Sequence, residues 1–75
     1  MAGTHAVVTE YDPNNGSYGA TSPDFGIHVI GIGKSEAEAV ERLHNALQGH
    51  LAFLRERGEP IPEPRSTVTT IAVAL

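Results

Sequence analysis

Residue types change along this chain in a way that divides it into predicted strands and one predicted helix. Residues 4–11 (THAVVTEY) are rich in β-branched and aromatic side chains, which is typical of a strand. Asn15 and Gly16 come next, and because both tolerate positive φ the pair predicts a hairpin. The short run YGAT at 18–21 is therefore expected to be the second strand of that hairpin.

A third strand is predicted after a break in this pattern. Pro23 lacks a backbone donor and Gly26 is conformationally permissive, so the segment SPDFG favours a loop. The following run IHVIGIG, residues 27–33, is typical of a strand. Gly31 and Gly33 weaken this strand, and they indicate a bulge or a close approach by another segment.

A helix over residues 36–57 has clear signals at both ends. Ser35 is a good N-cap, and Glu38, three residues later, completes a capping box. Gly58 supplies the expected stop. One apolar stripe repeats at three- and four-residue steps, and it predicts the face that packs on the sheet: Val40, Leu43, Leu47, Leu51 and Leu54.

Three prolines, Pro60, Pro62 and Pro64, follow the helix in the tract RGEPIPEPRS. The tract has three interpretations: a disordered linker, a ligand for a proline-binding domain, or a rigid connector within the fold. Proline stiffens the chain and does not continue a helix, and few residues remain after the tract. We therefore interpret it as a connector that returns the chain to a last strand within STVTTIAVAL (66–75), whose two faces are both apolar or small.

The predicted element order is β-β-β-α-β, an α+β fold in which one helix packs on a small mixed sheet to give two layers. A single helix covers only one face of the sheet. The other face also carries apolar residues, among them Val7 or Val8, Ile30 and Ile32. We expect a second copy of the chain to cover that face, so the predicted assembly is a homodimer or a tetramer.

Composition and charge narrow the possible functions. The chain has 75 residues and no cysteine, which allows one domain with a thin core and no disulfide or zinc–thiolate cluster. Its net charge is −4 and Lys and Arg together number 5, so direct nucleic-acid binding is not expected. No segment has the length of a membrane span or the pattern of a signal peptide, and we expect a cytoplasmic location.

Candidate catalytic and metal-binding residues are few, and we expect no enzyme activity, no metal and no cofactor. Glu10, Asp12 and Asp24 are the acids of the strand region. A two-metal nuclease needs such acids to converge, but both aspartates adjoin prolines and are better explained as turn residues. The two histidines of the predicted helix are six residues apart, unlike the i, i+4 pair of a zinc site. The segment GIGKS lacks the first glycine of a phosphate-binding loop, which leaves a weak anion site at the helix start as an alternative.

Two long segments of this chain resemble the HicB-like antitoxin family: VVTEYDPNNGSYGATSPDF and GKSEAEAVERLHNALQGHLAFLRERGEPIPEP. The first is similar to the family's opening strand, acidic hairpin, Gly/Tyr strand and Pro-Asp-Phe segment. The second is similar to its capped helix and the Gly-Glu-Pro-Ile-Pro-Glu-Pro sequence that follows. The resemblance covers nearly the whole chain, and it departs after Phe25, where the family's Leu-Pro-Gly-Cys turn is replaced by FGIHVIGIG.

This resemblance implies a partial ribonuclease-H-like fold that oligomerises. Full antitoxins of the family often add a C-terminal DNA-binding segment, whereas here we expect a single HicB-like domain over residues 1–75 with no additional DNA-binding domain. It also implies a partner: a small basic HicA-like toxin of double-stranded-RNA-binding fold, which cleaves mRNA and which the antitoxin neutralises. The acidic net charge suits such a basic partner. The alternative is a stand-alone homo-oligomeric domain that binds a small ligand or has a regulatory role, with no toxin partner.

Four residues are candidates for the surface that a protein partner contacts. Tyr18, Asp24 and Phe25 are expected around a loop that Pro23 holds open, where exposed aromatic rings beside a carboxylate would anchor a basic partner. Phe53 is the other candidate, since it lies about 120° around the helix from the apolar stripe. The alternative for each is ordinary packing within the domain.

Overall fold

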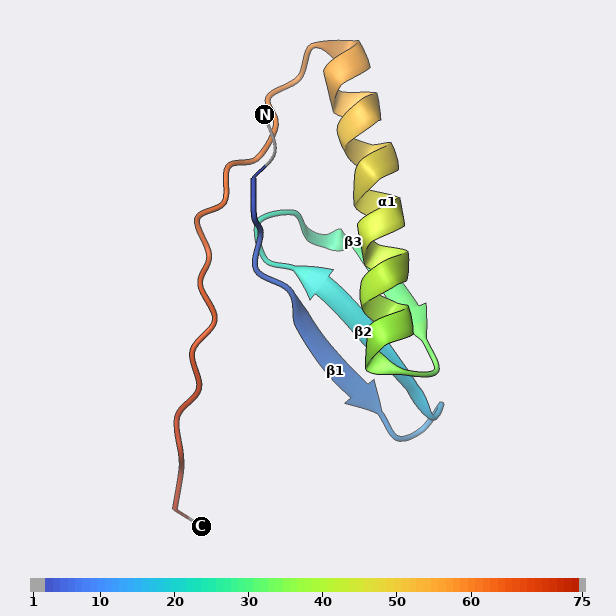
Figure 1. The fold of residues 1–75 in the computed structure, drawn as a ribbon, viewed down its shortest axis with the longest axis vertical. Coiled ribbons are helices and arrows are strands. Elements are labelled where there is room, and N and C mark those ends of the chain that lie inside the picture. Colours follow the sequence, from blue (N-terminus) through green and yellow to red (C-terminus); the bar gives the residue numbers. More distant parts are fainter. Residues whose placement is uncertain (1–2, 75) are drawn as a thin grey trace.

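The computed structural model describes residues 3–74, which form a three-stranded sheet followed by one helix (Figure 1). The strands β1 (Val8–Asp12), β2 (Ser17–Ser22) and β3 (Gly26–Gly33) pair antiparallel in the order β1-β2-β3. The helix α1 (Glu36–Arg57) covers one face of the sheet and packs mainly on β3. The structure thus confirms the predicted α+β arrangement of three strands and a helix in two layers.

The hairpin between β1 and β2 forms at the predicted Asn15-Gly16 pair. Gly16 has a φ of 64°, and its N–H donates to the Asp12 carbonyl at 2.8 Å. The Asp12 carboxylate accepts two more hydrogen bonds within the turn, from the Asn14 N–H at 2.9 Å and from the Asn15 side chain at 2.7 Å. Asp12 is therefore the turn residue that its place before a proline predicted.

Both predicted ends of α1 are confirmed. The Ser35 hydroxyl accepts a hydrogen bond from the Glu38 N–H at 3.1 Å, and the Glu38 carboxylate accepts one from the Lys34 N–H at 2.8 Å. At the other end Gly58 has a φ of 69°, which is the left-handed conformation that glycine adopts without strain. The Glu59 N–H then donates to the Leu54 carbonyl at 2.9 Å and closes the helix.

The core lies where α1 meets β3, and it depends on small residues. A Cβ atom at Gly31 would overlap the Ala39 carbonyl oxygen and the Leu43 nitrogen, and one at Gly33 would lie 2.7 Å from the Ala39 nitrogen. The helix backbone therefore rests directly on the strand backbone. Ala20 and Ala39 are fully buried beside this contact, and Leu43 is 1% exposed. The close approach that the two glycines indicated is confirmed.

The opposite face of the sheet has no cover within residues 3–74. The strand register places Val8, Thr21 and Ile30 in one row of that face, with Ile32 in the next. Val8 is 38% exposed, Ile30 49% and Ile32 52%. This apolar outer face matches the predicted set of residues, with Val8 rather than Val7 as its member from β1.

The predicted last strand is the part of the fold that the structure contradicts. Residues 59–74 carry no helix or strand. The first part, residues 59–66 (the connector), runs from α1 back toward the start of the chain, and residues 67–74 (the tail) continue as an extended segment (Figure 1). A strand needs a hydrogen-bonded neighbour, and among the described residues the tail has none. The sheet is consequently antiparallel throughout rather than mixed.

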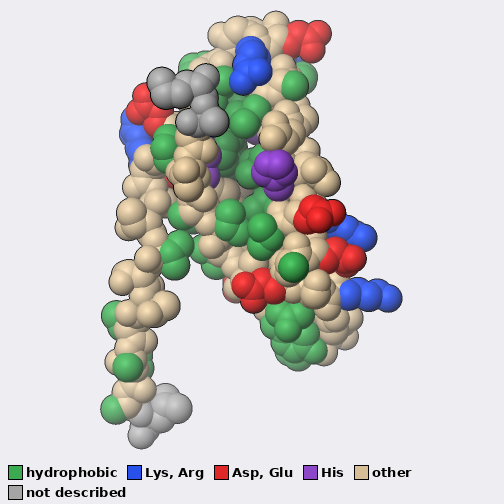
Figure 2. All heavy atoms as spheres, viewed as in Figure 1, with side chains coloured by type: hydrophobic (Ala, Val, Ile, Leu, Met, Phe, Trp, Pro, Cys, Tyr) green, Lys and Arg blue, Asp and Glu red, His purple; other side chains and the backbone are tan. Residues whose placement is uncertain are grey.

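The tail also changes the shape of the molecule. The radius of gyration is 14.0 Å, whereas a compact chain of this length would have about 11 Å. The space-filling view shows the tail as a thin extension that stands off the body (Figure 2). The connector itself fits its predicted role as an ordered return path from the helix, although it leads to no strand of the same chain.

The close contact between α1 and β3 gives a first prediction. We expect Gly31→Ala to lower the free energy of unfolding by about 1–3 kcal/mol, because the new methyl group meets backbone atoms that have no room to move. Gly49→Ala is the control: a Cβ atom at Gly49, inside α1, has nothing within 4 Å, so this substitution should raise stability by about 1 kcal/mol. Thermal and urea melts measure both. Equal effects of the two substitutions would contradict the close contact.

Candidate partner-binding groove

A groove of about 930 Å³ lies between α1, the segment before β1 and the connector. Three stretches distant in sequence form its walls: residues 3–7, one face of α1 from Val40 to Arg55, and residues 61–64. Phe25 joins them from the turn after β2. Apolar side chains gather between the connector and α1 in the space-filling view (Figure 2). Most of the lining is apolar, and it includes Val7, Phe25, Val40, Leu43, Leu47, Leu51, Ile61, Pro62 and Pro64.

The groove arises because the sheet covers only part of the apolar stripe of α1. Leu43 and Leu54 of that stripe are buried. The pattern did not assign Ala39 to the packing face, yet it is fully buried, because its small side chain lets the helix approach β3. The remaining members of the stripe are half-buried and line the groove: Val40, Leu47 and Leu51.

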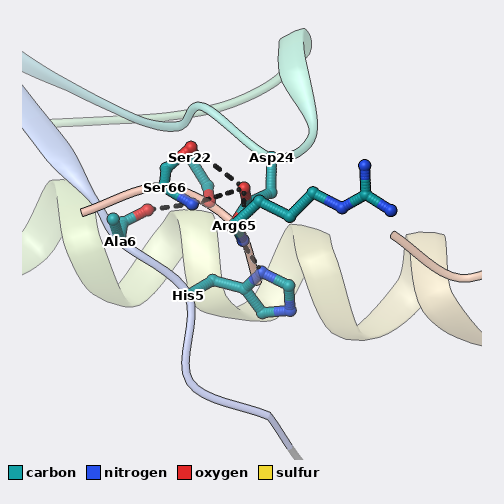
Figure 3. Close-up of polar contacts among 6 residues, drawn as sticks. All are labelled: His5, Ala6, Ser22, Asp24, Arg65 and Ser66. Atoms are coloured by element: carbon teal, nitrogen blue, oxygen red, sulfur yellow. Dashed lines mark hydrogen bonds and ion pairs between the residues drawn. The ribbon is translucent and has the colours of Figure 1, made fainter. Parts of the chain in front are cut away.

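Asp24 joins the connector to the start of the chain (Figure 3). Its Oδ1 accepts hydrogen bonds from the N–H groups of Arg65 and Ser66, both at 3.2 Å, and from the Ser66 hydroxyl at 3.0 Å. Its Oδ2 lies 2.8 Å from Nδ1 of His5. The Asp24 side chain is only 4% exposed, so its oxygens are occupied by partners from the same chain. We call this group of contacts the Asp24 clamp.

These contacts lower the pKa of the Asp24 carboxyl below its ordinary value of 3.8. The hydrogen bond with His5 is the largest cause, and the hydrogen bonds from Arg65 and Ser66 act in the same direction. Burial opposes them, because removal from water disfavours the charged form. Asp24 is therefore an ionised acceptor at neutral pH, and the clamp is made with its charged form.

Phe25 lies next to the clamp and reaches the groove. Its ring centroid is 4.8 Å from that of His5 at an interplanar angle of 60°, and 6.1 Å from that of His50 at 80°. The Phe25 N–H donates to the Ser22 carbonyl at 2.9 Å, which makes the loop a tight turn rather than an open one. Phe25 is half-buried and lines the groove, so part of its ring is available to a bound partner.

Tyr18 does not lie where it was expected. It pairs with Tyr11 in β1 and with Gly33 in β3, at the end of the sheet away from the loop after β2. Its ring centroid is 5.0 Å from that of Tyr11, and it packs against the core. The expected grouping of Tyr18 with Asp24 and Phe25 is therefore wrong, and only the latter two lie together.

Phe53 is exposed on α1, as its position on the helix predicted. It is 51% exposed, and the Arg57 guanidinium lies 5.2 Å from its ring centroid. It does not line the groove. Its role as a partner contact stays a prediction, as do those of Tyr18, Asp24 and Phe25.

Sequence reasoning missed the residues that Asp24 binds. His5 lies 19 positions before Asp24, and Arg65 and Ser66 lie 41 and 42 positions after it. No local pattern connects residues so far apart. Within the described part of the chain, no three His, Asp or Glu side chains lie close enough together to hold a metal ion.

The fold and groove can now be compared with known proteins. No family model matches the chain, and no curated protein does. Among solved structures, the chain is similar to the N-terminal domain of the Burkholderia pseudomallei antitoxin HicB. The TM-score is 0.70 and the sequence identity 30%, and the match covers 81% of this chain and 69% of that one. This chain belongs to the HicB-like antitoxin family.

Membership of the HicB-like family supports an antitoxin-like role for the chain, as its resemblance predicted. Such a role points to a protein-binding module rather than a catalyst, and the groove offers a concave, mostly apolar surface for binding. No helix in residues 3–74 has both the length and the apolar character needed to cross a membrane.

The lowered pKa of Asp24 gives a prediction for the pH dependence of stability. The folded state favours the ionised carboxyl, so the clamp contributes stability above the unfolded value of 3.8 and loses it as the pH falls through the lower folded pKa. We expect Asp24→Asn to be less stable than the wild type near neutral pH, and the difference to shrink below about pH 4. The measurement is urea unfolding of both proteins across that range.

Glu10→Gln is the control for this comparison, since it removes an exposed negative charge outside the clamp. Amide exchange at Arg65 and Ser66 should also become faster in Asp24→Asn, because a neutral amide oxygen, a weaker acceptor, replaces the carboxylate that both N–H groups bind. A stability difference that stays constant across the pH range, or that Glu10→Gln reproduces, would contradict the clamp.

Proposed function

We propose that this chain is an antitoxin-like module that binds and neutralises a small mRNA-cleaving toxin, and that the groove is the binding surface. The similarity to the antitoxin HicB N-terminal domain carries this proposal. The groove supports it because its half-buried apolar side chains are partly exposed to water, and a bound partner would cover them. Concave apolar surfaces with a few polar groups are where proteins commonly bind partners and ligands.

Charge also favours a basic toxin as the partner. The chain has a net charge of −4. The groove itself is lined by one acid, Glu63, and one base, Arg55, so the acidity that favours a basic toxin belongs to the whole chain rather than to the groove. An RNA-cleaving protein needs cations to bind its substrate, so an acidic partner speeds its capture and competes with RNA.

The predicted contact residues take different roles in this proposal. Phe25 is the anchor, because its ring lines the groove. Asp24 acts indirectly, since it holds the connector that forms one wall. Phe53 and Tyr18 lie outside the groove, and they would contact the toxin only if it extended over α1 or around the far end of the sheet.

We propose no catalytic step for the chain itself. Of the acids considered for a two-metal nuclease, Asp12 is hydrogen-bonded within its turn and Asp24 is occupied by the clamp. Glu10 points from the outer face of the sheet, where it pairs with Gly19 in the register. These acids therefore serve separate local structures.

A second candidate function is a stand-alone homo-oligomeric domain without a toxin. The exposed apolar outer face and tail favour it, because both are surfaces that a second copy would cover. The two functions differ in one observable, which is whether a different protein binds the chain in a fixed ratio.

Affinity purification of the tagged chain from its own cells, followed by mass spectrometry and an RNA-cleavage assay, tests the toxin proposal. We expect a small basic protein in a fixed ratio to the chain, and we expect added chain to stop that protein from cleaving mRNA. The absence of such a protein, or cleavage that the chain leaves unchanged, would overturn the proposal.

Calorimetric titration of variants against that toxin locates the binding surface. We expect Phe25→Ala to weaken binding by about 1 kcal/mol or more, as the loss of an interface anchor commonly does. The matched control is Ile27→Ala, an exposed apolar side chain two positions further on that does not line the groove. Unchanged binding by Phe25→Ala, with a melt that shows it folded, would place the toxin elsewhere.

A further inference from the structure

The tip of the hairpin between β1 and β2 carries an asparagine followed by a glycine, Asn15-Gly16. Both residues are exposed, and a Cβ atom at Gly16 would have nothing within 4 Å. The backbone nitrogen of Gly16 is therefore shielded neither by a side chain of its own nor by another element of the fold. An asparagine in such a place reacts readily with the backbone nitrogen that follows it.

This reaction is a cyclisation that needs only water and a solvent base. The Gly16 nitrogen loses its proton to the base and forms a bond to Cγ of Asn15. The bond between Cγ and Nδ2 then breaks, and the nitrogen takes up a proton from solvent and leaves as ammonia. Water opens the resulting cyclic succinimide at Cγ to give aspartate, or at the backbone carbonyl carbon of Asn15 to give isoaspartate. The net change is the uptake of one water and the release of ammonia.

Asp12 engages both reacting groups in a way that opposes the cyclisation. Its Oδ2 accepts a hydrogen bond from Nδ2 of Asn15 at 2.7 Å, and its carbonyl accepts one from the Gly16 N–H at 2.8 Å. The first contact commits the Asn15 amide to Asp12, and the second engages the proton that Gly16 has to lose. The negative charge of the carboxylate also disfavours a second negative charge on the nearby nitrogen.

We propose that Asn15 is a site of spontaneous deamidation, and that Asp12 sets the rate by restraining the turn. The reaction then requires a local opening in which the Asn15 side chain leaves Asp12 while the rest of the domain stays folded. No residue of the hairpin lines the groove. The modification therefore depends neither on the toxin nor on the proposed binding surface.

Either product weakens the hairpin that contains it. An aspartate at position 15 places a second carboxylate where the amide donated to Asp12, so an attraction becomes a repulsion between like charges. Isoaspartate lengthens the backbone by a methylene group, and the turn geometry sets the register of the adjoining pairs Asp12–Ser17 and Tyr11–Tyr18. Each event also makes the net charge one unit more negative than −4. The hairpin thus acquires a mark that accumulates with the age of the protein.

Peptide mapping by mass spectrometry of the purified chain, aged at mildly alkaline pH, tests the proposal. We expect the modification at Asn15 and not at Asn14 or Asn45, because the residues after those two carry side chains. Asp12→Ala should deamidate at least about threefold faster than the wild type, because it loses a hydrogen bond to a charged acceptor whose exposure to water limits the effect. Glu10→Gln removes an exposed charge from the same strand and should deamidate at the wild-type rate.

Gly31→Ala distinguishes local restraint from general loosening of the fold. It destabilises the contact between α1 and β3 but leaves the Asp12 contacts in place, so its rate should equal that of the wild type where both are folded. Equal rates in the wild type and Asp12→Ala, modification at Asn14 or Asn45 instead, or an equal acceleration by Gly31→Ala would each overturn the proposal. Any of these results leaves the toxin proposal unaffected, because the hairpin is not part of the groove.

Discussion

The contact between the backbone of α1 and the backbone of β3 determines where everything else in this molecule lies. Gly31 and Gly33 have no side chain to keep the helix away, and Ala39 contributes only a methyl group on the other side. The helix is therefore fixed at its N-terminal half, close to the sheet. Its C-terminal half continues past the strands, and the apolar residues there are left without a sheet to cover them (Figure 1).

The Asp24 clamp supplies the second constraint, because it holds together segments that the helix contact does not reach. It ties His5 before β1 and Ser66 at the end of the connector to the turn after β2. With these segments in place, the face of α1 from Val40 to Arg55 lies opposite two walls, and the result is the groove. The clamp also fixes the point from which the tail departs, so both the groove and the exposed tail depend on one carboxylate.

Much of the fold was predictable from the sequence because its determinants are local. Ser35, Glu38 and Gly58 lie within one turn of the ends they define, and Asn15-Gly16 lies in the hairpin it forms. The absence of the last strand was not predictable, since residues 66–74 have the pattern of a strand and yet pair with no strand of the sheet. The pattern shows that a segment can form a strand, and a hydrogen-bonded neighbour decides whether it does.

The candidate site was predictable only in part, because its residues come together from distant parts of the sequence. Asp24 and Phe25 were identified as residues of interest, but the clamp joins Asp24 to residues up to 42 positions away, and no spacing rule reaches that far. Tyr18 was grouped with them because it is near in sequence, although the strand between them carries it to the far end of the sheet.

The central claim is that the sheet and helix are ordered by their own contacts, whereas the connector is held in place by the Asp24 clamp. Amide hydrogen exchange of the purified wild type and of Asp24→Ala, followed by mass spectrometry, tests this most directly. The account predicts that peptides from β3 and α1 are protected equally in both proteins, and that the N–H groups of Arg65 and Ser66 lose protection in Asp24→Ala. A connector that stays protected in Asp24→Ala, or a sheet and helix that lose protection together with it, would contradict the claim.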